Sequence, residues 1–509
     1  MTGKPDIIKT KSTKILSQDK KRRKIMKKFL TLVLALVMVV CVGVGLVACN
    51  PENQEPEDTT IYVGNTAGVT GALASVGAPF NFGIEAAFAK YNAEGGFDGR
   101  QVKLKHYDDG GDATKSVSLM EKLIFEDEVF AIVGNFGSYA VNVNLETIKE
   151  EQVPMIYAAA GNDTLYNANA TTDEDKVVFP VQPLNVTEGR SLIARAFAAA
   201  IMPDASAPEG YVLTGGLGAT KVGVISNSNE ASQSLLAGIK EEANKLSAEK
   251  KAAIVYQEVA GSDYSAAAQA LVAGGCDVVI VTTIGTDYLA ALTALSNANY
   301  TKSVLTSYNN ASAAVFNDPT TNTITANGAD ILSKMTVYSQ GWIDISSATY
   351  LYKKDDSALY QTYKTMGLTT VVDDVDYGMA GFNEEYWAIA EQLYAHALAT
   401  GKNATEAFMM SYDPYALAGY IAGDLFCQGL KEIKTAGKEL TRENLVEIME
   451  SKVFDIALGD KVNFQNGARK GVEAFGLSVV YVANGAAGAA TVPGTTLSTI
   501  DGLRALIVG

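Results

Sequence analysis

The sequence is poor in the residues that most often carry catalysis or bind metals: 509 residues include two His and four Cys. The two histidines, His106 and His396, lie far apart in the sequence, so a catalytic arrangement of Ser-His-Asp or Cys-His type would need the fold to bring one of them to a nucleophile. His106 falls on the inward face of a predicted strand, which favours a packed core residue. Cys and His show no spacing typical of a metal site. We therefore predict no catalytic residue, no metal site and no cofactor.

The cysteines do not form a disulfide framework either. Cys41 and Cys49 fall in an N-terminal apolar run, and only Cys276 and Cys427 remain in the rest of the chain. Because both lie in apolar helix or strand contexts, we predict that they are buried packing residues.

Nucleotide-binding loops are also missing. The sequence has no GxxxxGK[ST] motif, and its glycine-rich stretches at 43–48 and 215–221 do not connect a strand to a helix. The adjacent acids Asp108 and Asp109 are interpreted as solvated charge on a surface loop.

Positive charge is concentrated at the N-terminus. Met1–Lys28 holds eleven Lys or Arg and two acids, so the net charge of −16 conceals a strongly acidic body. Such a body argues against nucleic acid as a partner, because neutralising phosphates requires an excess of Lys and Arg.

The basic start is followed by an apolar run, Phe29–Ala48, which predicts an export signal over residues 1–48. Leu46–Cys49 resembles a bacterial lipobox, in which the cysteine thiol is lipidated, and residues 49–60 have the composition of a flexible tether. We predict a lipid-anchored protein on the extracytoplasmic face of the cell membrane, with Cys49 as the lipidation site. An uncleaved membrane anchor is the alternative, since 20 apolar residues can span a bilayer. Met26 would itself begin a normal signal, so residues before it are interpreted as a misassigned start.

From Thr60 onward, strand patterns alternate with helical patterns in two series. The first series predicts strands at 61–64, 101–107, 129–134 and 153–158, and the second predicts strands at 221–226, 252–259, 277–283 and 303–308. A further strand is predicted at 335–342. Two such series indicate an α/β protein with two doubly wound parallel-sheet lobes. Residues 196–220 and 343–411 are interpreted as insertions, the second with extra helices such as 384–398.

Open α/β sheets bind ligands at the carboxyl ends of their strands. In the first series these ends carry the loops 135–139 and 158–163, where Ser138 is predicted at a helix N-terminus that suits a ligand carboxylate. The alternative is a serine that only caps its own helix. Asparagines gather at the strand ends of both series, where a turn-forming role is the alternative for each: Asn135, Asn227, Asn229, Asn309 and Asn310.

The order of the predicted elements, together with several short stretches of sequence, resembles a known protein family. The stretches 70–77, 90–112, 130–138 and 153–162, together with 439–455 and 462–471, resemble the Leu/Ile/Val-binding family of type I periplasmic solute-binding proteins. The resemblance implies two lobes joined by a hinge of three crossings. It places lobe 1 at 61–183 and 339–455, with the insertion at about 343–411, and lobe 2 at 184–338 and 456–509, with the insertion at about 196–220.

The same resemblance implies where a ligand is held. In lobe 1, Gly137, Ser138, Ala159 and Gly161 match positions around a ligand carboxylate, and Val76 matches a side chain that lines the site. The family often has Thr or Ser where Gly161 stands, so only a backbone N–H is expected there. In lobe 2, Ala231 stands where amino-acid binders present a tyrosine, and Asn309 or Asn310 stands where they present an acid for the ammonium group. Glu230 is the expected substitute for that acid.

These residues predict a lipid-anchored solute-binding protein of an ABC importer, whose partners are a small polar solute, such as an amino acid or a related compound, and a membrane permease. Three alternatives stay open: a ligand-sensing receptor domain on the same fold, a hydrolase that uses the same site, and a surface interaction protein that works through residues 343–411.

Overall fold

The computed structural model describes residues 59–200, 215–318, 320–321, 323–343, 384–411, 413–483, 485–492 and 497–508. The predicted signal peptide, Cys49 and, within the predicted insertions, residues 201–214 and 344–383 lie outside the described residues. Thr59–Gly509 forms one compact unit. Within the described ranges, none of the helices combines the length and apolar character that a membrane crossing needs.

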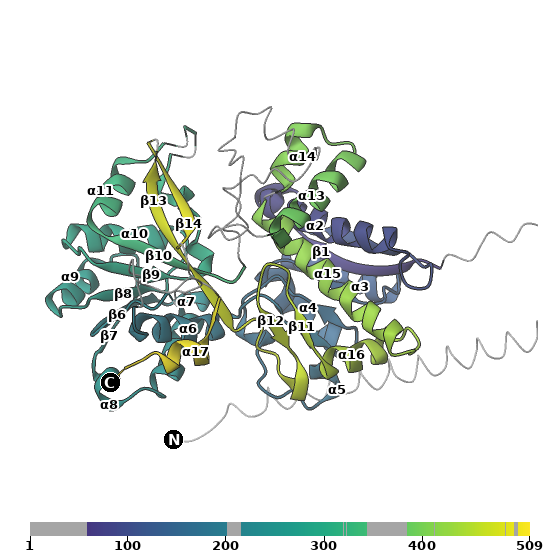
Figure 1. The fold of residues 1–509 in the computed structure, drawn as a ribbon, viewed down its shortest axis with the longest axis horizontal. Coiled ribbons are helices and arrows are strands. Elements are labelled where there is room, and N and C mark those ends of the chain that lie inside the picture. Colours follow the sequence, from purple (N-terminus) through teal and green to yellow (C-terminus); the bar gives the residue numbers. More distant parts are fainter. Residues whose placement is uncertain are drawn as a thin grey trace, which may run out of the picture. The chain divides into compact units, whose positions relative to one another are not determined.

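The first sheet consists of five parallel strands in the order β2-β1-β3-β4-β5, of which Figure 1 labels β1. Its strands are β1 (Ile61–Ala67), β2 (Val102–Asp108), β3 (Ile132–Val133), β4 (Met155–Ile156) and β5 (Val178–Phe179). The four strands predicted for the first series are therefore confirmed, whereas β5 was not predicted. Each of the first three βα loops leads into a helix: α2 (Ala74–Ala93), α3 (Ala113–Phe125) and α4 (Ser138–Glu150).

The second sheet has five parallel strands, in the order β7-β6-β8-β9-β10, and an antiparallel edge made by β13 and β14. The parallel strands are β6 (Val222–Asn227), β7 (Ile254–Val259), β8 (Val278–Val281), β9 (Ser303–Thr306) and β10 (Thr336–Gly341), and all five match predicted strands. The returning chain adds β13 (Ala474–Ala483), β14 (Ala486–Thr491) and the short β15 (Ser498–Thr499), which the sequence patterns did not predict. The α/β architecture with parallel-sheet cores is confirmed, and the second sheet is mixed.

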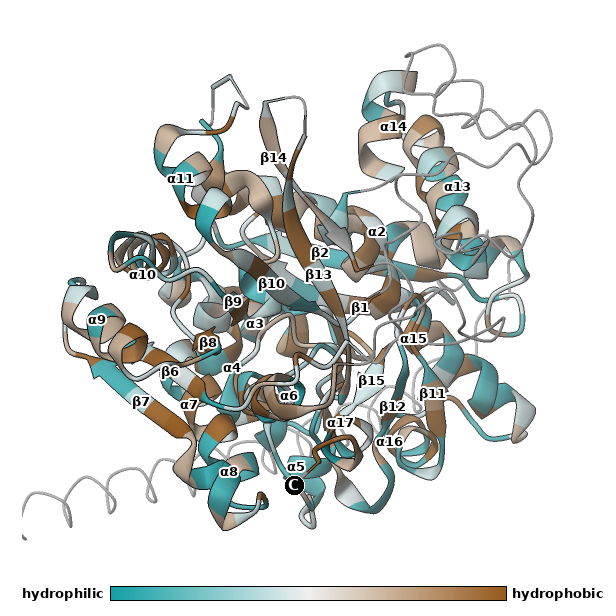
Figure 2. Cartoon of the chain, turned by 60° about the vertical axis from the view of Figure 1, so that its left-hand side comes forward, coloured by the Kyte–Doolittle hydropathy of each residue, from teal (hydrophilic) through white to brown (hydrophobic). Residues whose placement is uncertain are grey.

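Hydropathy follows position in this sheet. The residues of β8 are Val278, Val279, Ile280 and Val281, all buried, as expected for a central strand covered on both faces. The edge strand β7 carries hydrophilic residues as well (Figure 2). The helices around this sheet are α6 (Asn185–Phe197), α7 (Glu230–Ala243), α8 (Ala248–Ala252), α9 (Ser265–Ala273), α10 (Thr286–Asn297), α11 (Ala326–Lys334) and α17 (Ile500–Ala505).

Two segments cross between the hydrophobic cores. The boundary predicted at 338/339 falls inside β10, which stays in the second sheet to Gly341, and Trp342 then packs in the first-lobe core beside Tyr157, with ring centroids 6.2 Å apart. The hairpin of β11 (Val453–Asp455) and β12 (Lys461–Asn463) continues to Phe464 and Val472, which belong to the first-lobe core. These contacts favour crossings near residues 342 and 473 rather than at the predicted 338/339 and 455/456. The third predicted crossing, at 183/184, and the division into two lobes stay a proposal.

The first-lobe core depends on a close contact between α2 and α15 (Pro414–Thr435). On α2, the predicted apolar face is buried, with Phe80, Ile84, Phe88 and Tyr91 between 0% and 4% exposed. Glycine allows the two backbones to touch, because a Cβ on Gly83 would collide with the carbonyl oxygen of Ala416. Likewise, Gly419 lies against the carbonyl oxygen of Phe80. The helices α13 (Glu384–Ala399) and α14 (Ala404–Ser411), of which α13 was predicted, extend this layer, and α13 packs on α2.

Gly419→Ala tests this contact. The new Cβ would overlap the carbonyl of Phe80, so we expect the free energy of unfolding to fall by about 3 kcal/mol, the upper range for overpacking a well-packed core. The measurement is urea denaturation followed by circular dichroism. Gly261→Ala is the matched control, because no atom lies within 4 Å of the position that its Cβ would take, and the substitution should be nearly neutral. Equal stability of the two variants would contradict the close packing of α2 and α15.

Candidate functional site

In the first lobe, backbone pairing continues past the ends of β3 and β4. The N–H of Gly137 donates to the carbonyl of Ala159 at 3.1 Å, and the N–H of Ala159 donates to the carbonyl of Asn135 at 2.9 Å. These bonds bring the two predicted loops together. They also occupy the amide groups of Gly137 and Ala159, so donors for a ligand at this edge have to come from the start of α4.

Ser138 is the first residue of α4, and its side chain is exposed. The helix cap is Gly137, whose φ of 92° favours glycine, and no side chain caps this end. The alternative that Ser138 only caps its own helix is therefore wrong. The first N–H groups of a helix lack intrahelical partners and carry partial positive charge, so the start of α4 offers backbone donors and a hydroxyl to an anion.

Gly161 lies in the next loop and faces Asn185, the first residue of α6. The N–H of Asn185 donates to the carbonyl of Gly161 at 3.0 Å. A Cβ on Gly161 would lie 2.7 Å from Oδ1 of Asn185, so the amide group fills the space that a side chain would need. Asn185 is 6% exposed, and its Oδ1 has no hydrogen-bond partner among the described residues. This contact gives a structural reason for glycine where threonine or serine was expected.

The remaining predicted residue of the first lobe, Val76, lies in the first turn of α2 and is half-buried. The turn is held close to the preceding loop, because Gly77 packs against the carbonyl of Gly68. Asn135 is fully buried, and its Oδ1 accepts hydrogen bonds from the N–H and the hydroxyl of Thr66 at 3.2 and 2.9 Å. Asn135 therefore joins β1 to the loop after β3.

In the second lobe the predicted residues divide into exposed and structural ones. Glu230 begins α7 and is exposed, and Ala231 beside it is half-buried. Asn309 is exposed, and its Nδ2 donates to the hydroxyl of Ser307 at 3.0 Å. Asn310 is 4% exposed, and its Nδ2 donates to the carbonyl of Thr283 and to Oγ1 of Thr306 at 2.9 and 2.8 Å. The amide donors of Asn310 are therefore engaged in the fold.

The structure also brings forward a residue that the sequence patterns did not single out. Asp287 lies in the first turn of α10 and is half-buried. Its Oδ2 accepts hydrogen bonds from Nδ2 of Asn227 at 3.0 Å and from Nδ2 of Asn229 at 3.3 Å. Two strand-end amides thus converge on one carboxylate. The sequence signal that could have identified Asp287 is its position: it follows Gly285 at the start of a helix, just after a buried strand.

Two interpretations of charged residues are wrong. His106 is exposed rather than packed, because β2 is the edge strand of its sheet. Asp109 is 1% exposed rather than solvated, and its Oδ1 accepts a hydrogen bond from the Tyr139 hydroxyl at 2.6 Å. The predicted burial of Cys276 and Cys427 is confirmed. Within the described ranges, no group of three or more His, Cys, Asp or Glu residues is placed to hold a metal ion.

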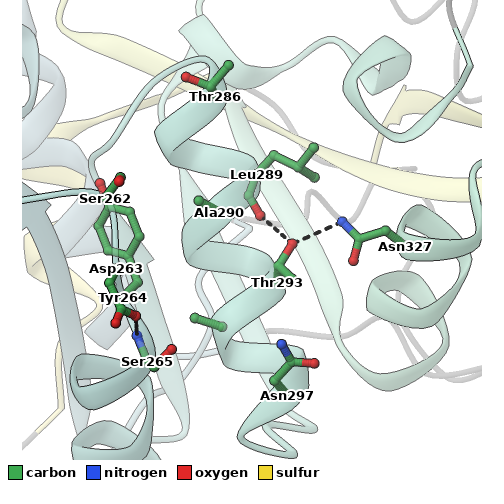
Figure 3. Close-up of a pocket in the computed structure, with 11 residues that line it drawn as sticks. Ser262, Asp263, Tyr264, Ser265, Thr286, Leu289, Ala290, Thr293, Asn297 and Asn327 are labelled. Atoms are coloured by element: carbon green, nitrogen blue, oxygen red, sulfur yellow. Dashed lines mark hydrogen bonds between the residues drawn. The ribbon is translucent and has the colours of Figure 1, made fainter.

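A cavity of about 410 Å³ lies on the second lobe, beside α10 (Figure 3). Ser262, Asp263, Tyr264 and Ser265 line one side of it, and Asn327 lines another. The hydroxyl of Thr293 accepts a hydrogen bond from Nδ2 of Asn327 at 3.0 Å within this cavity. None of the predicted site residues lines it, so it is separate from the residues discussed above.

The contact between Gly161 and Asn185 can be tested by a double-mutant cycle. Gly161→Ala should lower the free energy of unfolding by about 1–3 kcal/mol, because its Cβ overlaps the amide of Asn185. Asn185→Ala removes that obstacle, so the double variant should be more stable than the sum of the single effects predicts. Chemical denaturation of all four proteins measures the coupling. Strictly additive effects would show that the two residues do not share one space.

Comparisons with known proteins agree with this architecture. The family model described as periplasmic binding protein matches residues 60–486. Among curated relatives, Leu/Ile/Val-binding protein homolog 2 of Brucella abortus (strain 2308) is 35% identical over 104 residues, which cover 20% of this chain and 28% of the relative. An amino acid binding protein of Pseudomonas aeruginosa is 33% identical over 78 residues, which cover 15% of this chain and 21% of the relative. The match thus spans less than a third of the length of each of these relatives.

Solved structures show the same fold at low sequence identity. A type 1 periplasmic binding protein from Bordetella pertussis Tohama I aligns with a TM-score of 0.55 at 13% identity, covering 85% of this chain and 100% of that chain. A fatty acid ABC transporter substrate-binding protein from Thermomonospora curvata gives 0.54 at 17% identity, covering 89% and 96%. A solute binding protein from R. palustris in complex with benzoate gives 0.51 at 15% identity, covering 87% and 99%. The chain belongs to the periplasmic binding protein family and has its type I fold.

Proposed function

We propose that this protein is the solute-binding component of an ABC importer, anchored by lipid on Cys49 at the extracytoplasmic face of the membrane. It binds a small polar solute, an amino acid or a related compound, between the strand ends of its two lobes, and a membrane permease receives the solute. Two observations in a periplasmic binding protein support the proposal: the start of α4 offers donors to an anion, and the half-buried carboxylate of Asp287 on α10 offers a partner to a cation.

The anionic end of the solute meets the start of α4. Exposed Ser138 offers its hydroxyl, and the first N–H groups of the helix offer donors and a favourable dipole. A carboxylate bound there gains charge-assisted hydrogen bonds without a buried counter-ion.

The cationic end meets Asp287 rather than Glu230. Glu230 is an exposed first-turn residue, whereas Asp287 is half-buried and held by the amides of Asn227 and Asn229. Because two neutral donors fix the carboxylate without cancelling its charge, Asp287 remains attractive to an ammonium group. The sequence predicted Glu230 as the partner of the ammonium group, so a Glu230 variant is the control for the Asp287 variant.

Binding shifts the equilibrium between an open and a closed arrangement of the lobes. A solute that contacts both edges binds the closed form better, and only this difference in affinity can move the equilibrium. No catalytic step is part of the proposal. The related structures name a fatty acid and benzoate as bound or transported compounds, and the curated relatives name amino acids, so these classes define the compounds to test.

The test is a thermal-shift screen of the full chain in mild detergent with L-leucine, other amino acids, benzoate and octanoate. A compound present at 100 times its Kd stabilises the protein by about 2.7 kcal/mol, which is visible as a higher Tm. If an amino acid binds, Asp287→Asn should weaken it at least tenfold, as expected for losing a charge-assisted hydrogen bond of about 1.5–3 kcal/mol. Glu230→Gln should bind as the wild type does.

Each alternative result has a distinct meaning. Stronger loss in Glu230→Gln than in Asp287→Asn would restore Glu230 as the ammonium partner. A Tm that no compound shifts would contradict solute binding and favour the receptor or surface-interaction alternatives. Chemical change of the bound compound, detected by mass spectrometry, would favour the hydrolase.

A further inference from the structure

Glu188 is a fully buried acid that contacts a loop of the proposed site. It lies in the first turn of α6 and is 0% exposed. Its Oε2 accepts a hydrogen bond from the hydroxyl of Ser307 at 2.6 Å, and its Oε1 accepts one from the N–H of Tyr308 at 2.7 Å. Both donors are neutral, and both belong to the loop that follows β9.

The same loop carries Asn309, a predicted ligand residue. The backbone N–H and the Nδ2 of Asn309 both donate to the hydroxyl oxygen of Ser307, at 3.1 and 3.0 Å. A serine oxygen has one proton to donate and two lone pairs to accept with. Ser307 therefore uses its full capacity: it accepts twice from Asn309 and donates once to Glu188.

This arrangement suits the ionised form of Glu188 best. Each carboxylate oxygen accepts one hydrogen bond, and a hydrogen bond to an ionised acceptor is shorter and stronger than one to a neutral acceptor. Protonation removes the charge and turns one carboxylate oxygen into a hydroxyl, so the hydrogen bonds from Ser307 and from the N–H of Tyr308 weaken.

The loop also connects the two lobes. The Tyr308 hydroxyl donates to the carbonyl of Pro183, in the segment that enters the second lobe. The Tyr308 side chain packs against the first-lobe core. Tyr157 lies in that core, and its pKa is raised by burial and, to a smaller extent, by the nearby Tyr308. A change in the hydrogen bonds of residues 307–309 therefore acts where a ligand and both lobes meet.

The charged groups around Glu188 are engaged with other partners. On α6 itself, buried Arg195 donates to the carbonyls of Gly215 and Phe475. The charged groups on α7, α17 and the returning chain pair among themselves or with Arg190 on the outer side of α6: Glu241, Glu242, Lys245, Lys470, Glu473, Asp501 and Arg504. β8 and β9 carry no charged residue. Tyr308 is the titratable side chain that faces Glu188, and burial together with Glu188 raises its pKa.

From this geometry we infer that Glu188 is a positioning residue for the ligand loop, and that its protonation loosens Asn309 and weakens solute binding as the pH falls below neutrality. The inference rests on the proposed function for its ligand but not for the loop itself.

Glu188 changes its ionisation near neutral pH, the range in which the order of the loop after β9 is expected to change. Burial raises the pKa of Glu188 from 4.5 to about 7, against the opposing effect of the hydrogen bonds from Ser307 and Tyr308. Because this folded-state value lies above the ordinary one, the folded protein binds more protons than the unfolded chain between these two values. Glu188 therefore makes the fold less stable as the pH rises from 4.5 through 7. In the folded protein, the ionised form of Glu188, and with it the ordered loop, becomes the major form above about pH 7.

The test compares the full-length wild type with Glu188→Gln by hydrogen–deuterium exchange of residues 303–311 at about pH 6, 7 and 8, without ligand and with correction for the intrinsic exchange rate. In the wild type, protection of the Asn309 amide should fall about tenfold from pH 8 to pH 6, as one proton with a pKa near 7 requires. Glutamine keeps one acceptor and presents an N–H to Ser307, so Glu188→Gln should show the low protection of pH 6 at every pH. Glu146→Gln, an exposed carboxyl on α4, is the matched control and should follow the wild type.

The binding measurement uses L-leucine, or the compound that gives the largest shift in the thermal screen, by calorimetry at the same pH values. The wild type should bind about tenfold more tightly at pH 8 than at pH 6, and Glu188→Gln should show no such dependence.

If no compound binds while protection of the loop changes with pH as described, the proposed solute binding fails and the role of Glu188 stands. If a compound binds but wild-type protection does not change with pH, or Glu188→Gln keeps the pH dependence, the inference is overturned. If Glu188→Gln does not fold, Ser307→Ala takes its place in the test. In this variant Asn309 lacks the hydroxyl that accepts its hydrogen bonds at every pH. Protection of the Asn309 amide that still changed with pH in Ser307→Ala would overturn the inference.

Discussion

The contact between α2 and α15 is the constraint on which the first lobe depends. The two helices are separated in the sequence by the whole parallel part of the second sheet, yet their backbones touch because glycines face carbonyl groups on both sides. Burial of the apolar face of α2 requires this partner, since an isolated helix gains little stability in water. Along the sequence, the parallel part of the second sheet therefore comes before α15, the helix that covers the apolar face of α2.

The same constraint places the extra helices. α13 and α14 precede α15 and pack on the outer side of this layer, where the ring of His396 lies 5.0 Å from that of Phe82. The start of α15 remains near the first-lobe strand ends, because Tyr415 in its first turn contacts Phe136, with centroids 6.5 Å apart. α13 and α14 therefore enlarge the first-lobe core, to which Trp387, Leu393 and Phe408 belong.

Local sequence patterns predicted nine of the ten parallel strands, including the edge strands β2 and β7, but missed β5 and the returning strands β13, β14 and β15. Buried runs such as the one in β8 are apolar at every position, so composition alone identifies them. β14 reads AAGAAT, which has little β-propensity, and it becomes a strand because it pairs with β13. β5 has only two residues, and its pairing with β4 defines it. In each case a partner distant in sequence or a neighbouring strand decides the structure.

The candidate site shows the same division. Helix starts after strands were predictable, and Ser138 lies at one of them. Hydrogen-bond partners were not predictable: the amide of Asn310 is used inside the fold, and two asparagines converge on Asp287 from 60 and 58 residues away in the sequence. Sequence position identifies which residues stand at the edge of a sheet, and only three-dimensional pairing decides which of them still have donors or charge to offer a ligand.

Asp108 and Glu188 have pKa values shifted in opposite directions because burial and hydrogen-bond donors act on them in different proportions. Asp108 is half-buried and accepts hydrogen bonds from the Thr70 hydroxyl and from the N–H groups of Gly110, Val69 and Thr70, which together hold its pKa below the ordinary value. Glu188 is fully buried and has only two donors, so desolvation prevails and its pKa rises. The number of donors relative to burial thus separates a permanently charged scaffold residue from one that titrates near neutrality. Asp108 fixes loops of the first lobe, and Glu188 contacts the loop that follows β9.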